Sequence, residues 1–536
     1  MTPTPEMNIA AFLAKSATHH PDRAAIVHGT RTITYAELYR RALNIGGELL
    51  GRGLQRGDRV AFALHNSPEV LETVFGCLAA GLVVVPMNAR LHAKEMAYIA
   101  RSSGARVLIH SAAFTAEIER HLTEFDGIEW RFEVNGESGA ENYRNLLNSP
   151  DALPAPVEIT SEDASWLFYT SGTTGRPKGA TWTHRTGRVV VMNYLSDVYN
   201  IGAEDVVLHA APLSHGSGIV ALPTIARGAT NVILDALSFS PELLFETVAR
   251  HQVSHIAFLA PTQIVALLDK YNPARFDLST LKAVCYGGAP IYLEHLKSAV
   301  ATFGPIFSQI YGQGEAPITA TGLDRAMHAR FAATDDPRLG SAGIARTDVE
   351  VRVVDPDGLP VAAGEPGEII VRGDVVMRGY WNNPEATAET LHDGWLHTGD
   401  VGTLDEGGYL FLLDRTKDMV VSGGNNVYPR EVEEVLITHP AVADVVVFGI
   451  PDEYWGEAVH AVVVIEEGQH ADADELIRYC ADSLAGYKKP KAVEFVPDLP
   501  VSAYGKVLRR EVRDRYWIGH DRKVGGGARG VAAPTP

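Results

Sequence analysis

The sequence is poor in cysteine, has no excess of positive charge and has no long hydrophobic run. Cys77, Cys285 and Cys480 are its only cysteines and form no CxxC pair, which argues against a disulfide framework or a zinc cluster and favours a reducing compartment. Lys and Arg total 47 and Asp and Glu total 66, so the formal charge of −19 argues against a general nucleic-acid binder. The longest apolar runs, such as residues 77–87, are far shorter than a membrane span.

What remains is the composition of a folded protein. The 536 residues are 46% hydrophobic and 21% charged, which is typical of a globular chain and not of a disordered one. Residues 1–14 have no basic segment followed by a strongly apolar one, so we expect no secretory signal. We therefore expect a cytoplasmic protein with no integral membrane segment and no nucleic-acid partner.

Short β-branched runs alternate with helical patterns over the first 400 residues. A helix is expected at 69–80, and strands are expected at 59–64, 82–86, 106–110, 206–211, 231–235, 256–259 and 282–286. This alternation predicts an α/β fold with a largely parallel sheet. Turn signals at 355–358 and 405–408 lie between strand-like runs and predict a β-rich subdomain over about 350–413.

A second α/β series begins near residues 414–418 and predicts a domain boundary there. Helices are expected at 430–439 and 473–484, and strands at 443–448 and 459–465. The end of the chain begins Val-Gly-Gly-Gly at 524 and is expected to be disordered. We predict a large N-terminal domain of layered α/β sheets over 1–416, a small mobile C-terminal α+β domain over 417–523, and a tail over 524–536.

The segment at 169–179 has the composition of a phosphate-binding loop. It reads Tyr-Thr-Ser-Gly-Thr-Thr-Gly-Arg-Pro-Lys-Gly and follows an apolar run at 166–168. Small residues let backbone amides approach a polyanion closely, and the hydroxyls and the lysine add donors. An ordinary polar surface loop could have the same composition. No Gly-x4-Gly-Lys-Ser/Thr frame fits the segment, so a P-loop kinase or GTPase is disfavoured.

Seven further motifs follow this loop in chain order. They are Pro-Leu-Ser-His-Gly at 212–216, Tyr-Gly-Gly-Ala-Pro at 286–290, Tyr-Gly-Gln-Gly-Glu at 311–315, Gly-Trp-Leu-His-Thr-Gly-Asp at 394–400, Asp-Arg-Thr-Lys-Asp at 414–418, Ser-Gly-Gly-Asn-Asn-Val-Tyr-Pro at 422–429 and Gly-Lys-Val-Leu-Arg at 505–509. Together with the loop they resemble the adenylate-forming superfamily of acyl-CoA synthetases, luciferases and peptide-synthetase adenylation domains. The resemblance extends from about residue 35 to residue 510.

The resemblance implies a two-step reaction that uses ATP, Mg²⁺ and coenzyme A. A carboxylate first attacks the α-phosphate of ATP and gives acyl-AMP and pyrophosphate. The thiol of coenzyme A then displaces AMP and gives a thioester. A carboxylate is a poor electrophile until one of its oxygens becomes a good leaving group, so the protein's task is positioning and neutralisation of charge at the phosphates.

The resemblance also implies a nucleotide site built from most of these motifs. The phosphates would be held by Thr170, Ser171, Gly172, Thr173, Thr174 and Lys178. The adenine would lie against Gly287, Gly288, Ala289 and Pro290, with Tyr311 stacked on it and Gly312 and Gln313 beside it. Asp400 would accept the ribose hydroxyls, and Arg415 would contact the ribose or a phosphate.

Three residues are implied as catalytic, namely Lys506, Glu315 and Thr170. Lys506 would bridge the attacking carboxylate and the α-phosphate as negative charge accumulates there; as an isolated Gly-Lys pair it would be an exposed turn. Glu315 would coordinate Mg²⁺, since a carboxylate beside a triphosphate makes sense chiefly with a cation between them. Lys417 would be the hinge about which the small domain swings between the two half-reactions.

The acyl and thiol sites are implied less directly. His215 would lie between the acyl pocket and the thiol tunnel, with Tyr286 also in the pocket, although His215 could instead be a strand-end histidine with a backbone partner. Gly423, Gly424 and Lys488 would contact coenzyme A. The glycines could instead form a plain turn, although their motif favours the tunnel, and Lys488 with Lys489 could equally be a solvated pair.

One position departs from the family's pattern. The family usually has threonine before the glutamate of the Tyr-Gly motif, whereas this sequence has Gly314. The missing hydroxyl leaves a contact to the α-phosphate that Thr170, water or backbone would have to make.

The leading prediction is an AMP-forming acid–CoA ligase for a fatty or aromatic monocarboxylic acid. The segments 209–222 and 285–290 contain no Arg or Lys, which disfavours a dicarboxylic acid. The alternatives are a stand-alone enzyme that loads a carrier protein, a luciferase-like oxidase on the same scaffold, and a non-catalytic nucleotide-binding protein.

Overall fold

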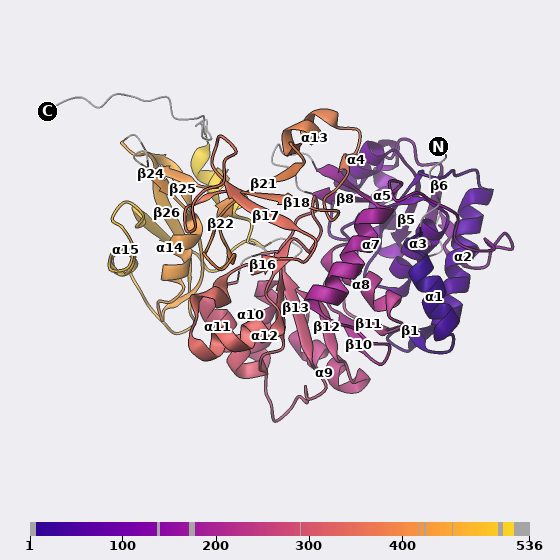
Figure 1. The fold of residues 1–536 in the computed structure, drawn as a ribbon, viewed down its shortest axis with the longest axis horizontal. Helices are drawn as coiled ribbons and strands as arrows, with labels where there is room; N and C mark the ends of the chain where they lie inside the picture. The colour runs from indigo at the N-terminus through magenta and orange to yellow at the C-terminus, as the bar shows by residue number, and fades with distance from the viewer. Residues whose placement is uncertain are drawn as a thin grey trace.

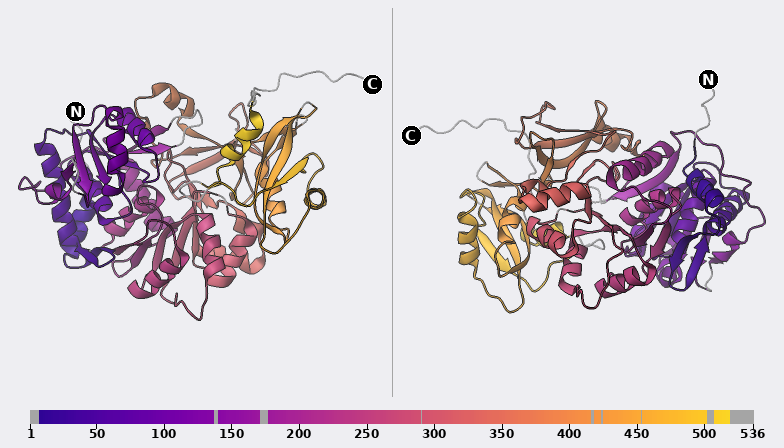
Figure 2. Two further views of the ribbon diagram at one scale, coloured as in Figure 1. Left: turned by 180° about the vertical axis from the view of Figure 1, so that it is seen from behind. Right: turned by 60° about the horizontal axis from the view of Figure 1, so that its bottom comes forward.

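The structure is a computed structural model that describes residues 7–136, 140–170, 177–289, 291–415, 418–422, 425–452, 454–501 and 507–518. Two large sheets and their helices form most of the molecule, a third sheet lies above them, and a small domain lies at the end opposite the first helices (Figures 1 and 2). The predicted α/β class, with a large N-terminal and a small C-terminal part, is confirmed.

The first sheet has eight strands in the order β19-β9-β8-β4-β3-β5-β6-β7. Their bounds are β3 Arg59–Ala63, β4 Val83–Met87, β5 Ala105–Ser111, β6 Trp130–Val134, β7 Glu141–Asn142, β8 Ala164–Thr170, β9 Lys178–Thr183 and β19 Gly379–Tyr380. The pairs from β8 to β7 are parallel, and those of β9 with β8 and β19 are antiparallel. All residues of β4 are buried, which explains its continuous apolar run, because parallel strands are covered on both faces.

The second sheet has seven strands in the order β14-β13-β12-β10-β11-β1-β2 and is parallel apart from the β1–β2 pair. Its strands are β1 Ala24–His28, β2 Arg31–Thr34, β10 Val206–His209, β11 Thr230–Ile233, β12 His255–Leu259, β13 Ala283–Gly287 and β14 Phe307–Ile310. The carboxyl ends of β13 and β14 lead directly into residues 287–289 and 311–315, so this edge brings two of the predicted nucleotide motifs together.

Sixteen α-helices cover the sheets of the described chain. They are α1 Ala11–His19, α2 Tyr35–Gly51, α3 Pro68–Ala79, α4 Ala93–Ser103, α5 Thr115–Arg120, α6 Arg144–Leu147, α7 His184–Asn193, α8 Gly216–Ala226, α9 Pro241–His251, α10 Pro261–Lys270, α11 Leu293–Phe303, α12 Arg325–Thr334, α13 Pro384–Thr390, α14 Pro429–Leu436, α15 Ala473–Ala481 and α16 Arg509–Asp514. Short helical turns are η1 Ala112–Phe114, η2 Leu122–Glu124, η3 Tyr194–Val198, η4 Pro337–Gly340 and η5 Arg515–Trp517. Several helices begin at a side chain that accepts from the first turn, as Ser240 and Asp324 do for α9 and α12.

The predicted β-rich subdomain is a five-stranded antiparallel sheet. It contains β17 Glu350–Val354, β18 Gly367–Arg372, β20 Leu391–His392, β21 Trp395–Leu404 and β22 Leu410–Arg415. The expected turn at 405–408 joins β21 to β22, and Gly408 donates to the Asp405 carbonyl oxygen across it (3.0 Å). The short pair β15 Thr321–Gly322 and β16 Ile344–Ala345 lies before this sheet in the chain.

The small domain has its own five-stranded sheet, in which α14 and α15 pack against β25 and β27 and against each other. Its strands are β23 Val420–Ser422, β24 Asn425–Val427, β25 Val442–Asp452, β26 Gly456–Ile465 and β27 Ala492–Phe495. Side chains such as Val432, Val445 and Val463 form a separate apolar core. The strands and helices expected after residue 420 are all present, which confirms the second α/β series.

No helix within the described part of the chain combines the length and the apolar character that crossing a bilayer requires.

Candidate active site

Glu315 lies where two distant segments meet. Its carboxylate is 7% exposed, and its Oε1 accepts hydrogen bonds from the hydroxyls of Thr170 (3.1 Å) and Tyr380 (2.7 Å). Thr170 ends β8 and Glu315 follows β14, so the fold brings together two of the predicted catalytic residues from two different sheets. Both donors are neutral, so neither cancels the negative charge of the carboxylate.

Tyr380 was not found by sequence reasoning. It lies on β19, which pairs with β9, and its ring centroid is 5.2 Å from the ammonium of Lys178 at the start of β9. Burial, followed by the nearby Glu315 carboxylate, raises the pKa of the Tyr380 phenol well above its ordinary value, so the hydroxyl stays protonated as a donor. A single tyrosine therefore contacts both a predicted phosphate ligand and the predicted metal ligand.

Asp400 is the second buried carboxylate and is 9% exposed. Its Oδ2 accepts hydrogen bonds from the Tyr311 hydroxyl (2.8 Å) and the Gln313 amide (2.5 Å), and its Oδ1 lies 3.2 Å from Nε of Arg415. Asp400 and Arg415 face each other across β21 and β22. A carboxylate has about four acceptor positions, so Asp400 retains capacity for a ribose hydroxyl.

The charges and burial around Asp400 fix the protonation states of its partners Arg415 and Tyr311. Burial lowers the pKa of Arg415, but the carboxylates of Asp400, Asp418 and Glu315 raise it more, and the net shift is upward. Burial and then the adjacent Asp400 raise the pKa of the Tyr311 phenol well above its ordinary value. Arg415 is therefore a cation and Tyr311 a neutral donor.

The glycines of the nucleotide motifs are required by close packing. A Cβ on Gly287 would lie 2.4 Å from the Ile310 carbonyl oxygen, and a Cβ on Gly312 would lie 2.5 Å from the Ala316 carbonyl oxygen. Gly288 has φ +77°, a left-handed conformation that side chains other than glycine rarely adopt. Residues 287 and 312 are thus packed closely against neighbouring backbone, and contact of residues 287–289 with adenine stays a prediction.

Gly314, the departure from the family's pattern, has a structural explanation. A Cβ at this position would lie 2.3 Å from Cγ2 of Thr170 and 2.8 Å from Cδ1 of Phe168. The space that a threonine side chain would fill is therefore taken by Thr170 and Phe168. Nε1 of Trp182 donates to the Gly314 carbonyl oxygen (2.6 Å) and fixes the peptide in place.

His215 faces a row of aromatic rings. Its ring meets the edge of Phe168 at 5.0 Å, and Phe168 stacks on Trp182 at 5.2 Å with an interplanar angle of 9°. Nδ1 of His215 lies 2.9 Å from the Ser214 hydroxyl. Burial lowers the pKa of His215 to about 3, so its imidazole is neutral near pH 7.

Tyr286 lies on β13 and points into the core on one side of the second sheet. Its side chain is 1% exposed in the core formed with α9 to α12, and its hydroxyl lies 3.0 Å from Nε2 of His328. The neighbouring Cys285 points to the other face of the sheet, towards Phe258. Because side chains alternate along a strand, Tyr286 lies on the opposite face of the sheet from Cys285. A place for Tyr286 in the acyl pocket stays a prediction.

Lys488 pairs with Glu431 of α14 in the small domain. A coenzyme A contact for Lys488 stays a prediction. Other predicted site residues lie outside the described residues, and their roles also stay predictions: Ser171, Gly172, Thr173, Thr174, Pro290, Lys417, Gly423, Gly424 and Lys506.

Two family models match this chain. Residues 13–381 match the family model described as "AMP-binding enzyme", and residues 431–506 match "AMP-binding enzyme C-terminal domain". The chain is 39% identical over 510 residues to a feruloyl-CoA synthase of an Amycolatopsis species, with 95% of this chain and 99% of that protein covered. It is 36% identical over 512 residues to the fatty acid–[acyl-carrier-protein] ligase ScoC of Streptomyces coeruleorubidus, covering 95% and 96%.

A solved structure gives the same result for the fold. The amide bond synthetase McbA from Marinactinospora thermotolerans superposes with a TM-score of 0.86 at 30% identity, covering 95% of this chain and 99% of that one. The two family models together match more than half of the 536 residues. The chain belongs to the family of AMP-binding, adenylate-forming enzymes.

Proposed function

We propose that this protein is an AMP-forming acid–CoA ligase that acts on an aromatic monocarboxylic acid. The observation that carries the proposal is the five-residue segment 311–315. Tyr311 and Gln313 at one end hold Asp400, the expected ribose acceptor, while Glu315 at the other end meets Thr170 and Tyr380. One short segment thus joins a sugar-binding end to a phosphate-binding end, as adenylation of an acid requires.

The buried carboxylate of Glu315 fits a magnesium ion that binds together with ATP. Mg²⁺ usually binds through one or two carboxylates together with substrate phosphates. Glu315 supplies one buried carboxylate, and within the described residues no group of three or more His, Cys, Asp or Glu forms a metal cage. Glu315 would therefore hold the ion jointly with the phosphates, where it would neutralise their charge.

The protein's own residues would position the reactants. Asp400 would accept the ribose hydroxyls while Tyr311 and Gln313 keep its orientation. The Thr170 hydroxyl has one proton, which it would move from Glu315 to a phosphate oxygen when ATP binds. Lys506 would lie between the acid's carboxylate and the α-phosphate and stabilise the charge that develops there. Pyrophosphate leaves, and the acyl-AMP formed is then attacked by the thiol.

The surroundings of His215 favour an aromatic monocarboxylic acid. Trp182 is buried and stacks with Trp166 and Phe168, so the partly exposed ring beside His215 is that of Phe168, against which another ring can pack. The neutral imidazole of His215 supplies no charge for a second carboxylate. The feruloyl-CoA synthase at 39% identity supports the same acid class.

A carrier protein is the alternative acceptor, favoured by the likeness to ScoC. We propose coenzyme A, which the resemblance to acyl-CoA synthetases implies and which the likeness to a feruloyl-CoA synthase at 39% identity supports. We further propose a cytoplasmic location, where both ATP and coenzyme A are available.

The test is acid-dependent pyrophosphate release from MgATP. The panel would contain a hydroxycinnamic acid, indole-3-acetic acid, octanoic acid, palmitic acid and malonic acid, each followed by addition of coenzyme A or of a carrier protein bearing phosphopantetheine. We expect the aromatic acids to give the highest kcat/KM, malonate to be inactive, and coenzyme A to be the acceptor. Equal turnover of palmitate and the aromatic acids would refute the proposed acid class, and transfer only to the carrier would refute the acceptor.

A further inference from the structure

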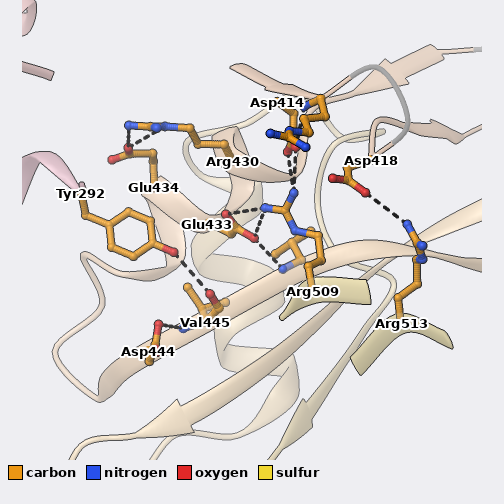
Figure 3. Close-up of polar contacts among 12 residues, drawn as sticks. Tyr292, Asp414, Asp418, Arg430, Glu433, Glu434, Asp444, Val445, Arg509 and Arg513 are labelled. Carbon is orange, nitrogen blue, oxygen red and sulfur yellow. Dashed lines mark hydrogen bonds and ion pairs between the residues drawn. The ribbon is translucent and has the colours of Figure 1, made fainter. Parts of the chain in front are cut away.

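The segment that follows the nucleotide-binding glycines touches the small domain. Nη2 of Arg430 on α14 donates to the Ile291 carbonyl oxygen (3.2 Å), and the Tyr292 hydroxyl donates to the Val445 carbonyl oxygen on β25 (3.3 Å) (Figure 3). The ring of Tyr292 also packs against the small domain's apolar core. A side chain of the large domain is thus part of the small domain's packing.

The surroundings of Tyr292 keep its hydroxyl protonated. Burial, and then the carboxylates of Glu433, Asp444 and Glu434, raise the pKa of its phenol well above the ordinary value, so the hydroxyl is a neutral donor. The Asp444 carboxylate accepts from the amide of Val445 (2.8 Å), the residue whose carbonyl oxygen Tyr292 contacts. Arg430 is itself held by an ion pair with Glu434 (3.0 Å).

A second contact between the domains lies beside the proposed hinge at Lys417. Arg509 of α16 pairs with Asp414 of the large domain (2.7 Å). Within the small domain, Arg509 also pairs with Glu433 (2.9 Å), and Arg513 pairs with Asp418 (3.2 Å). Tyr292 and Asp418 lie on opposite sides of Arg509 in Figure 3. Contacts beside a pivot move little when a domain rotates, whereas contacts away from it are broken.

We propose that Tyr292 is a positioning residue that holds the small domain in the pose seen here and couples that pose to the nucleotide loop. Tyr292 follows Gly287, Gly288 and Ala289 by only a few residues, so a nucleotide that orders this loop also orders the contact with the small domain. Coupling between the nucleotide loop and the small domain is reciprocal. Loss of the Tyr292 contact therefore changes the populations of the two poses. The inference rests on the proposed function, because it assumes two half-reactions carried out in two poses.

The test measures the two half-reactions separately in Tyr292→Ala, Tyr292→Phe and the wild type. Pyrophosphate release from acid and ATP reports the first, and thioester formation from supplied acyl-AMP and coenzyme A reports the second. Coupling energies between sites typically correspond to factors of about 5 to 150. We expect Tyr292→Ala to change the ratio of the two rates by about tenfold or more, and Tyr292→Phe, which keeps the ring, to change it by about threefold.

Tyr271→Ala is the matched control. Tyr271 is a partly buried tyrosine of the same domain whose ring packs against Phe245 and Phe303, so its loss destabilises the large domain without touching the small one. Its rate ratio should stay within about twofold of the wild type. Amide hydrogen exchange gives a readout besides activity: exchange at residues 429–447 should be faster in Tyr292→Ala than in Tyr271→Ala.

The outcomes separate this inference from the proposed function. A wild-type enzyme that performs both half-reactions, with Tyr292 variants that keep the wild-type ratio and exchange pattern, overturns the role of Tyr292 alone. A wild type that performs neither half-reaction overturns the proposed function, and the exchange comparison still decides whether Tyr292 holds the small domain. Should Tyr292→Ala fail to fold, Tyr292→Phe carries the test, and a ratio and an exchange pattern unchanged in it overturn the inference.

Discussion

Buried carboxylates occur both in the candidate active site and at the domain junction, but their partners differ. Glu315 accepts hydrogen bonds from two neutral hydroxyls, those of Thr170 and Tyr380. At the junction, Asp414 and Glu433 share the guanidinium of Arg509 through four contacts of 2.7 to 3.1 Å (Figure 3).

This difference in partners indicates different roles. The Glu315 carboxylate is available to a ligand, whereas those of Asp414 and Glu433 stabilise the protein. A carboxylate held by neutral donors keeps its full negative charge and can attract a cation that arrives with the substrate. A carboxylate paired with a buried guanidinium has its charge neutralised locally and serves to join two segments. Mutations around Glu315 should therefore change activity, whereas mutations around Asp414 and Glu433 should change the free energy of unfolding.

The largest expected effect is on the junction. Arg509→Met leaves the carboxylates of Asp414 and Glu433 buried without their cation, so we expect the free energy of unfolding to fall by about 3–5 kcal/mol. The measurement is urea denaturation. Arg510→Met is the control, because Arg510 is exposed and pairs only within α16 with Asp514; it should change stability by less than about 0.5 kcal/mol. Equal losses in the two variants would contradict a structural role specific to Arg509.

Lys506, three residues before Arg509, should show the opposite pattern. We expect Lys506→Ala to slow acyl-adenylate formation by about 100- to 1000-fold, comparable to deletion of a preorganised charge contact. Unfolding by urea should be unchanged within about 0.5 kcal/mol, and thioester formation from supplied acyl-AMP should survive. If both half-reactions fall equally in a folded variant, the role given to Lys506 is wrong.

A substitution at Gly314 tests how far the active site depends on close packing around Thr170. In Gly314→Ala the new methyl group must displace Thr170 or Phe168. Displacing Thr170 moves the hydroxyl that donates a hydrogen bond to Glu315. We expect adenylation to slow by about 10- to 100-fold, since overpacking of this kind typically costs about 1–3 kcal/mol. Gly202→Ala, where the nearest side-chain atom to a new Cβ is 3.6 Å away, should be nearly silent. Pyrophosphate release by the two variants is the measurement.

Tyr380 should give the smallest effect. Tyr380→Phe removes the hydrogen bond to Glu315 but keeps the ring near Lys178, and we expect adenylation to slow by about tenfold with a higher Mg²⁺ requirement. Tyr380→Leu removes both contacts and should be slower still. Identical rates in the Phe variant and the wild type would show that the hydroxyl does not orient Glu315.

Sequence reasoning found the alternation of strands and helices because buried strands leave continuous apolar runs, as at 83–87. The site motifs came from a resemblance to a family, and the roles that it implies stay predictions. Sequence reasoning missed Tyr380, since a lone tyrosine carries no signal until β19 pairs with β9. It gave no direction for the Tyr286 side chain, because that direction depends on the strand's place in the sheet. The packing reason for Gly314 needed the positions of Thr170 and Phe168.

The central claim is that the charge of Glu315 serves a cation bound with ATP, whereas the charge of Glu433 serves the junction. The most direct test is calorimetric titration of ATP binding at a series of Mg²⁺ concentrations in Glu315→Gln and Glu433→Gln. We predict that Glu315→Gln raises the Mg²⁺ concentration needed for half-maximal ATP binding by about tenfold or more, while Glu433→Gln leaves it within about twofold. An equal Mg²⁺ requirement in the two variants would contradict this claim.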